Sequence, residues 1–340
     1  MGRIWLVTGA ASGLGREIAR VALDAGDTVV PADRLTEGAG ELATAHPGRA
    51  QAVGLDVTDP ERVEAVVDGV IELYGRIDVL VNAAGRGHIG AVEETTEAEL
   101  RPLMELHFVG PAALTRAVLP HMRERRSGAI VQISSLGGQI SVPGLSACSA
   151  GKFALEGLSV SLAQEVAPLG IKVLIAQPGA MRTNFAGAAI GESARVADHE
   201  ATVGGLRAHV EEVTGRQPGD PVKITTAIVS ALADERTPLR PAFGNDTVDR
   251  LNEATKSAQD ERRTGARDPE HRLHRRVSPV RHSPTPGFPG RWGSAGRETP
   301  ALGVTHAASG PRAHRASMSS SARARLFSAS GINSDMAGVT

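Results

Sequence analysis

From residue 3 to about residue 245, short apolar runs alternate with segments whose apolar residues recur at helical spacing. After the first run, Leu14, Ile18, Val21 and Ala25 repeat at three- and four-residue intervals, and Gly26 is a natural helix stop. The pattern therefore predicts strands separated by helices. The runs predicted as strands lie at 3–8, 27–32, 50–57, 77–82, 128–134 and 171–176.

Most of these runs are almost continuously apolar, as expected for strands that are covered on both faces. Strands that alternate with helices favour right-handed crossovers and a parallel sheet. Asp59 followed by Pro60 marks one helix start, and the capping box of Thr96 and Glu99 marks another. We therefore predict the α/β class with a doubly wound parallel sheet.

The pattern stops near residue 260, where the charge also changes. Residues 261–340 contain 13 arginines, no lysine and five acidic residues, whereas the whole chain has a net charge of −1. A segment rich in Arg, Pro, Gly and Ser with single scattered apolar residues cannot offset its ordering entropy. We predict that 259–340 is a disordered tail without a selected function. It has no aromatic interleaving, so no specific nucleic-acid binding is expected.

Composition narrows the class further. Of all residues 41% are hydrophobic, which supports a sizeable core. Cys148 is the single cysteine, which excludes an intramolecular disulfide and leaves no metal-ligand pattern. No apolar run is long enough to span a membrane, and the glycine motif near the N-terminus leaves no room for a signal peptide. We expect a cytoplasmic protein without a metal or a membrane span.

The sequence TGAASGLG (8–15) lies between the first strand and the first helix. Gly9, Gly13 and Gly15 permit a tight turn and close approach of a pyrophosphate, and the helix N-terminus adds N–H groups and positive potential. The alternative is a tight turn without a ligand. The context of strand, turn and helix favours dinucleotide binding.

Asp33 follows Gly15 by 18 residues, at the end of the second strand. Its carboxylate can accept hydrogen bonds from the adenosine ribose and would repel a 2′-phosphate, which favours NAD over NADP. The adjacent Arg34 would offset part of this repulsion. Asp56 is a candidate for contact with the adenine edge. The alternative for each aspartate is a helix or turn cap.

Together these motifs resemble the short-chain dehydrogenase/reductase family over residues 3–255. The further matches are LDV (55–57), VNAAG (81–85), ISS (133–135), a C-x-x-x-K at 148–152 in place of Y-x-x-x-K, and PGAMRT (178–183). The resemblance implies one Rossmann-type domain, 1–258, with a seven-stranded parallel sheet. It places the last strand near 239–244 and a helix around 246–258.

The family binds NAD or NADP and moves a hydride between nicotinamide and a small alcohol or carbonyl substrate. The resemblance also implies a homo-oligomer. It assigns the nicotinamide end of the cofactor to Pro178, Gly179 and Thr183. Together with the reasoning above, the predicted cofactor-binding residues are Gly9, Ser12, Gly13, Leu14, Gly15, Asp33, Arg34, Asp56, Val57, Asn82, Ala83, Ala84, Lys152, Pro178, Gly179 and Thr183.

The family's catalytic serine and lysine correspond to Ser135 and Lys152, but two other catalytic positions differ. Cys148 replaces the tyrosine that gives or takes the proton, and His107 replaces the asparagine of the proton relay. A cysteine sulfur lies roughly 4 Å nearer its own backbone than a phenolic oxygen. We therefore expect a loss of about 10²–10⁴-fold in rate, the usual contribution of general acid–base catalysis.

Several interpretations stay open. Cys148 is either an inert buried side chain or a reactive thiol whose pKa Lys152 lowers; a role as an acyl-transfer nucleophile is weaker. His107 either carries a proton through water or only packs between helices. His88 is expected to be an exposed loop residue beside the substrate cleft. Gly151 should soften the catalytic helix. The function is weak hydride transfer or, alternatively, dinucleotide binding without turnover.

Overall fold

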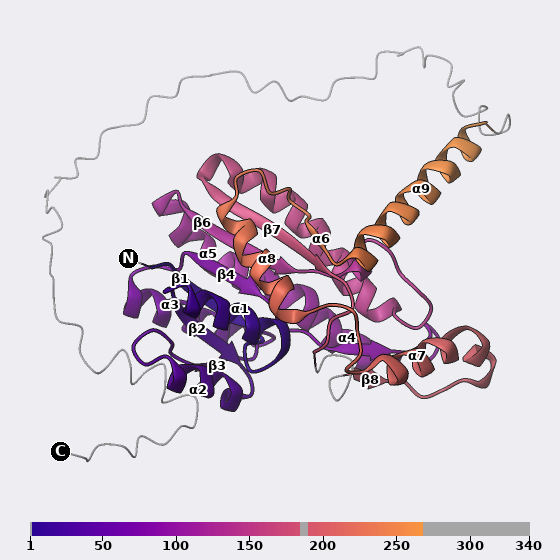
Figure 1. The fold of residues 1–340 in the computed structure, drawn as a ribbon, viewed down its shortest axis with the longest axis horizontal. Coiled ribbons are helices and arrows are strands. Elements are labelled where there is room, and N and C mark those ends of the chain that lie inside the picture. Colours follow the sequence, from indigo (N-terminus) through magenta and orange to yellow (C-terminus); the bar gives the residue numbers. More distant parts are fainter. Residues whose placement is uncertain (1, 184–189, 268–340) are drawn as a thin grey trace, which may run out of the picture. The chain divides into compact units, whose positions relative to one another are not determined.

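Strands and helices alternate along residues 2–183 and 190–267, which the computed structural model of the protein describes (Figure 1). The strands are β1 (Ile4–Thr8), β2 (Thr28–Asp33), β3 (Val53–Gly54), β4 (Val79–Asn82), β5 (Gly87–Ile89), β6 (Gly128–Ile133), β7 (Ile171–Pro178), β8 (Ile190–Glu192) and β9 (Ala242–Phe243). The helices are α1 (Gly13–Asp24), α2 (Thr36–Ala45), α3 (Pro60–Tyr74), α4 (Glu97–Met104), α5 (Gly110–Arg125), α6 (Ser146–Val166), α7 (Gly205–Val213), α8 (Pro221–Ala233) and α9 (Asn245–Arg267).

Seven strands form one sheet in the order β3-β2-β1-β4-β6-β7-β9, and every pair in it is parallel. The predicted seven-stranded doubly wound sheet is confirmed. The chain leaves β1 toward β2 on one side and later returns to add β4 on the other. In doubly wound sheets, ligands bind outside the carboxyl ends of the strands at such a change of direction, which here lies between β1 and β4.

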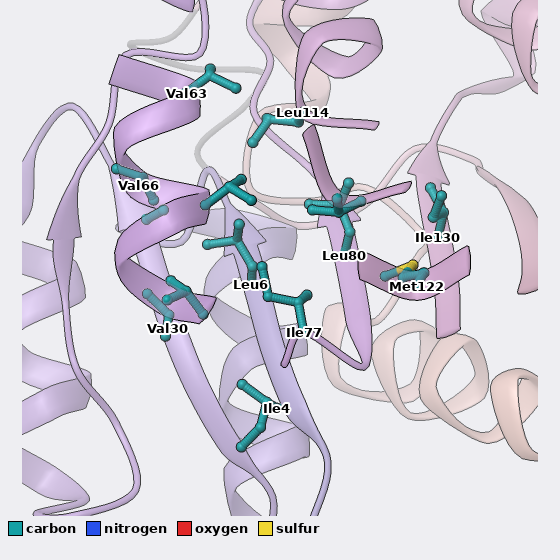
Figure 2. Close-up of a cluster of buried hydrophobic side chains, with 14 of the residues drawn as sticks. Ile4, Leu6, Val30, Val63, Val66, Ile77, Leu80, Leu114, Met122 and Ile130 are labelled. Atoms are coloured by element: carbon teal, nitrogen blue, oxygen red, sulfur yellow. The ribbon is translucent and has the colours of Figure 1, made fainter. Parts of the chain in front are cut away.

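Helices cover both faces of the sheet, which explains the continuous apolar runs. On one face α3, α5 and α6 pack against the sheet, and Leu6, Leu80 and Ile130 are fully buried beneath them (Figure 2). On the other face α1 and α8 pack against the opposite side chains of the same strands. Each fully buried Leu or Ile stabilises the fold by about 1.5–3 kcal/mol relative to an exposed one.

The predicted helix starts are confirmed. The Asp59 carboxylate accepts a hydrogen bond from the Arg62 backbone N–H at 3.0 Å, with Pro60 as the first helical residue of α3. Thr96 and Glu99 form the capping box of α4. A π-helical turn, Glu105–Val109, follows α4 and places one extra residue ahead of α5.

Among the boundaries that differ from the prediction, two stand out. The third strand is shorter than the run 50–57, although Ala50 makes an isolated bridge with Val29 and the Leu55 N–H donates to the Asp33 carbonyl at 2.9 Å. The last helix continues to Arg267 instead of ending at 258. Its later turns lack apolar periodicity but contain Ala, Gln, Glu and Arg, which favour helix without any buried face.

Residue contacts divide the chain into two units, of which the first includes the described residues up to 255 and the second begins at residue 256. Of the second unit, the described residues are 256–267, and they are helical. Most of the tail predicted as disordered, 268–340, lies outside the described residues. Within the described ranges, no helix is both long and apolar enough to cross a membrane.

Candidate active site

In the turn between β1 and α1, Gly9 and Gly15 lie close to neighbouring backbone atoms, whereas Gly13 does not. Gly9 has φ +67°, and a Cβ there would lie 2.8 Å from the Ala83 carbonyl oxygen. A Cβ on Gly15 would overlap the Gly9 carbonyl oxygen. At Gly13, with φ +56°, the Thr183 Cβ is the one atom of the described residues within 4 Å of such an atom, at 3.9 Å. Open space therefore remains beside the backbone at Gly13.

The first turn of α1 has N–H groups without a side-chain cap, because the Ser12 hydroxyl makes no capping bond. Leu14 lies in this turn. Uncapped N–H groups at a helix N-terminus form an anion site. Together with the space at Gly13, they fit a pyrophosphate.

Asp33 ends β2 directly beside this turn. Its two carboxylate oxygens accept hydrogen bonds from the backbone N–H groups of Ala11 at 3.0 Å and Leu35 at 3.1 Å. Each oxygen retains a further lone pair, because carboxylates offer about four acceptor sites. The exposed Arg34 guanidinium lies 3.9 Å from the Asp56 carboxylate, so its charge is shared with a second acid.

Two of the other adenosine-side residues donate their backbone N–H groups to Thr8. The Ala83 and Ala84 N–H groups reach the Thr8 hydroxyl at 3.1 and 3.3 Å. The Asn82 side chain is turned into the protein, where its amide nitrogen donates to the Gln132 side chain at 2.9 Å. Val57 is buried in the core.

PGAMRT begins at the end of β7. The Gly179 N–H donates to the Phe243 carbonyl at 3.0 Å, and Pro178 pairs with Phe243 in β9. The segment then reaches the glycine turn, because the Thr183 Cβ faces Gly13. Thr183 is thus the point where the two predicted cofactor segments meet.

Ser135 and Lys152 lie at the carboxyl end of β6. The Ser135 hydroxyl accepts a hydrogen bond from the Gly137 N–H at 3.1 Å. The Lys152 ammonium, on α6, donates to the Ile133 carbonyl at 2.7 Å. Burial lowers the pKa of Lys152 to about 8, although Cys148 and Glu156 favour its charged form.

The Cys148 thiol is held by the backbone of β5. Its sulfur accepts from the His88 N–H at 3.2 Å and donates to the His88 carbonyl at 3.6 Å. Burial raises the pKa of Cys148, outweighing the His88 hydrogen bond and the charges of Lys152 and Arg86. The Lys152 charge does lower the pKa of this thiol, as expected, but burial has the larger effect. The structure favours the inert thiol over the reactive one.

His107 lies in the π-helical turn and is 2% exposed. Its Nε2 accepts from the Arg86 N–H at 3.4 Å, so the proton of the neutral ring is on Nδ1, which has no partner among the described residues. A Cβ on Gly151 would lie 2.8 Å from the His107 Cβ. Because Gly151 has no side chain, the His107 side chain can pack against α6 at this position. The sequence alone did not show this role of the glycine.

We predict that His107 makes the protein less stable in mild acid. Burial, with a smaller effect of the Lys152 charge, lowers its pKa to about 3. The unfolded chain binds this proton below about pH 6.5 and the folded chain does not, so the stability present above pH 6.5 falls as pH decreases. The loss is about 1.4 kcal/mol per pH unit. Urea unfolding at pH 7.5 and 5.5 measures it. His107→Asn should reduce the difference, and an unchanged difference would contradict the assignment.

His88 is buried, which corrects the expectation of an exposed loop histidine. β5 pairs with β8, and the His88 Nε2 lies 2.8 Å from the Ser193 hydroxyl. That hydroxyl donates to Glu99 at 3.2 Å. The two-stranded sheet β5–β8 thus packs beside Cys148, and the His88 side chain joins this sheet to α4.

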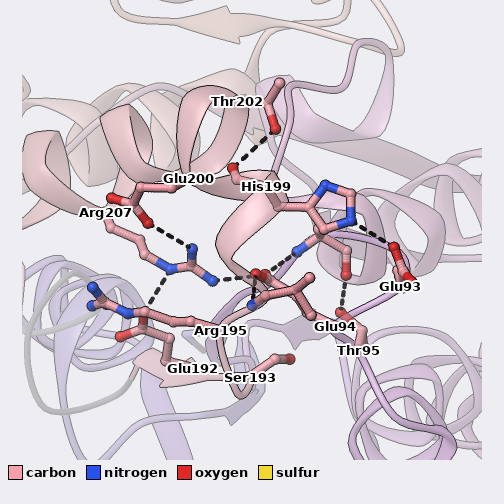
Figure 3. Close-up of polar contacts among 12 residues, drawn as sticks. Glu93, Glu94, Thr95, Glu192, Ser193, Arg195, His199, Glu200, Thr202 and Arg207 are labelled. Carbon is pink, nitrogen blue, oxygen red and sulfur yellow. Dashed lines mark hydrogen bonds and ion pairs between the residues drawn. The ribbon is translucent and has the colours of Figure 1, made fainter.

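A buried ion pair fixes the segment after β8 (Figure 3). The Glu94 carboxylate accepts from the Ala91 and Val196 N–H groups at 2.7 and 2.9 Å, and from the Arg207 guanidinium at 2.7 Å. Both side chains of this pair are almost fully buried. Glu192 lies 2.6 Å from the Arg207 Nε. Sequence reasoning missed this cluster, because residues so far apart carry no shared periodic signal.

The described residues contain no group of His, Cys, Asp and Glu side chains that could hold a metal ion.

This arrangement matches known proteins closely. The profile of the short chain dehydrogenase family matches residues 3–192. "Oxidoreductase BOA17" of Botryotinia fuckeliana is 38% identical over 265 residues, which cover 77% of this chain and 97% of that protein. The chain belongs to the short chain dehydrogenase family.

Solved structures of a short-chain dehydrogenase and a short-chain oxidoreductase are also similar to this chain. The crystal structure of a short-chain dehydrogenase from Streptomyces avermitilis is 54% identical, with a TM-score of 0.74, over 78% of this chain and 96% of that one. A metagenomic short-chain oxidoreductase in complex with NADP is 28% identical, with a TM-score of 0.57, over 71% of this chain and 96% of that one.

Proposed function

We propose that the protein binds NAD or NADP at the carboxyl ends of β1, β2 and β4, and slowly transfers a hydride between nicotinamide and a small alcohol or carbonyl compound. The observation that carries this proposal is the open space at Gly13 beside the uncapped N-terminus of α1. The cofactor supplies the hydride, and the protein must position it and move one proton.

The proposed binding roles follow the geometry. The turn Gly9–Gly15 and the start of α1, with Ser12 and Leu14, hold the pyrophosphate. Asp33 accepts from the adenosine ribose, and Thr183 lies where the nicotinamide half begins. The remaining proposed adenosine and nicotinamide contacts are Arg34, Asp56, Val57, Asn82, Ala83, Ala84, Lys152, Pro178 and Gly179. A cytoplasmic location and a homo-oligomeric state also stay predictions.

Slow turnover follows from the proton path. We assign the hydrogen bond to the substrate oxygen to Ser135. The Lys152 ammonium, with a pKa near 8, donates to the Ile133 carbonyl two residues before Ser135. Cys148 is protonated at neutral pH and its sulfur is engaged with the His88 backbone. Direct transfer from the thiol to the substrate is therefore unfavourable, and Lys152 is left to give the proton through water.

The second candidate is dinucleotide binding without turnover. It is supported by His107, whose pKa of about 3 keeps it neutral, so the ring has no readily lost proton at physiological pH. If neither Cys148 nor His107 supplies a proton, a bound cofactor would serve a sensing or scaffolding role. A measurable rate of substrate reduction by the unmodified protein decides between the two candidates.

We predict tighter binding of NADH than of NADPH, by about tenfold, because one uncompensated carboxylate facing a phosphate costs on the order of 1.4 kcal/mol. Asp33 supplies this charge, and Arg34 is already shared with Asp56. Calorimetric titration with both cofactors measures the ratio. Asp33→Asn should narrow it, whereas Asp68→Asn, an exposed position on α3, should not.

Equal affinities or tighter NADPH binding would overturn the assignment of Asp33. Failure of both cofactors to bind below millimolar concentration would contradict both candidate functions.

A further inference from the structure

Glu156 is a buried carboxylate one helical turn beyond Lys152 on α6. Its side chain is 4% exposed. One oxygen accepts from the Ser134 hydroxyl and from the Gln177 amide, both at 2.6 Å, and the other accepts from the Arg240 guanidinium at 2.9 Å. Three donors from separate parts of the sheet therefore converge on one acid.

These donors satisfy both oxygens of the buried carboxylate. An unpaired buried carboxylate would be expensive, and hydrogen bonds together with a counter-charge offset that cost. The Arg240 side chain remains 40% exposed, so the pair spans from the interior to the surface. Of the motifs in the sequence, ISS (133–135) contains one member, Ser134, but nothing in it indicated the cluster, because the other members lie on α6, in β7 and before β9.

Side chains of α6 contact the segment 133–135, at and just after the end of β6. The Ile133 carbonyl accepts from Lys152, the Ser134 hydroxyl donates to Glu156, and Ser135 follows directly. Two hydrogen bonds one helical turn apart thus fix both the rotation and the height of α6 against this strand end. The packed apolar face of α6 and the Cys148 thiol hold the helix elsewhere, and the hydrogen bond between Glu156 and Ser134 adds an anchor next to Ser135.

We propose that Glu156 is a positioning residue, which locks α6 against the end of β6 and so holds the Lys152 ammonium beside Ser135. This inference rests on the proposed roles of Lys152 and Ser135. Glu156 contacts neither substrate nor cofactor and acts through these two residues.

The charges around Lys152 make the proposal measurable. Cys148 and Glu156 face it from its own helix, and His107 faces it from the π-helical turn. Because Cys148 is protonated and His107 neutral near pH 7, Glu156 is the group in this set that carries a negative charge. Removal of the Glu156 charge should therefore lower the pKa of Lys152.

The test is to titrate Lys152 itself in the full chain without cofactor. The sequence has four lysines, so NMR of protein carrying ¹³Cε-labelled lysine gives four resolvable side chains. Lys152→Arg assigns the signal. The midpoint should lie near pH 8 in the unmodified protein. In Glu156→Gln it should fall by about one pH unit, the low end for removal of a neighbouring opposite charge.

Two further variants separate positioning from general loosening. Glu165→Gln makes the same chemical change at an exposed site on α6 and should leave the midpoint unchanged. Arg240→Gln retains the Glu156 charge but removes its counter-charge, so the midpoint should stay or rise. If Glu156→Gln fails to fold, Arg240→Gln carries the test.

A midpoint that is the same in Glu156→Gln and Glu165→Gln, or that falls in Arg240→Gln, would overturn the proposal. Because the titration uses no cofactor, it stands even if NADH does not bind. The proposed function fails separately, if the calorimetric titration shows no binding of NADH or NADPH.

Discussion

Replacing Cys148 with tyrosine is expected to raise the rate of ketone reduction by NADH about 10²-fold or more, because a positioned general acid contributes on the order of 10²–10⁴-fold. The phenolic oxygen would extend roughly 4 Å beyond the present sulfur. To reach the oxygen that Ser135 is proposed to hold, this side chain has to leave the His88 backbone that the sulfur now contacts. Lys152, one helical turn away, favours the phenolate. Single-turnover rates against secondary alcohols, ketones and aldehydes measure the gain.

Cys148→Phe is the matched control, because it adds the same ring without the hydroxyl. Both variants lose the hydrogen bonds between the sulfur and the His88 backbone. Thermal unfolding of both therefore reports the structural cost separately from the chemistry. If the tyrosine variant reduces substrates no faster than the phenylalanine variant, the missing phenol is not what limits turnover.

His107 sets a limit on this gain. The family's relay has an asparagine where this chain has an imidazole that fills the space beside Gly151. If the relay also limits the rate, Cys148→Tyr alone recovers only part of the activity, and adding His107→Asn recovers more. A gain from the second change without the first would place the main defect at His107.

The sheet and the glycine turn were predictable because their signals are local. A strand covered on both faces must be apolar at successive positions, and β1, β4 and β7 are. A turn that approaches a ligand with its backbone needs glycine. The φ angles of Gly9 and Gly13 are positive, where a side chain would be strained.

The surroundings of the catalytic helix were not predictable in the same way. Cys148 was correctly placed on the helix with Lys152, but the strand β5 that holds its sulfur was not anticipated. The sequence left the thiol either reactive or inert, because a count of nearby charges omits burial, which here has the larger effect on its pKa. Gly151 looked like a defect in the helix until His107, 44 positions earlier, was found packed against it.

Substituting Gly13 with alanine is expected to weaken NADH binding by about tenfold or more while the fold survives. A methyl group there would enter the open space beside the backbone and displace a pyrophosphate from the N–H groups of α1. The loss of even one charge-assisted hydrogen bond costs about 1.5–3 kcal/mol, which is tenfold or more in affinity. Calorimetric titration of the variant measures it.

Gly26→Ala is the control, because Gly26 also has a positive φ, +89°, and no atom within 4 Å of a Cβ. Both alanines carry a similar backbone strain of roughly 1–2 kcal/mol, so the two variants should unfold at similar urea concentrations. Only Gly13 adjoins the proposed pyrophosphate site, so only its variant should lose affinity. If the two variants bind NADH with equal affinity, the cofactor does not bind at this turn, and the open space at Gly13 has no assigned role.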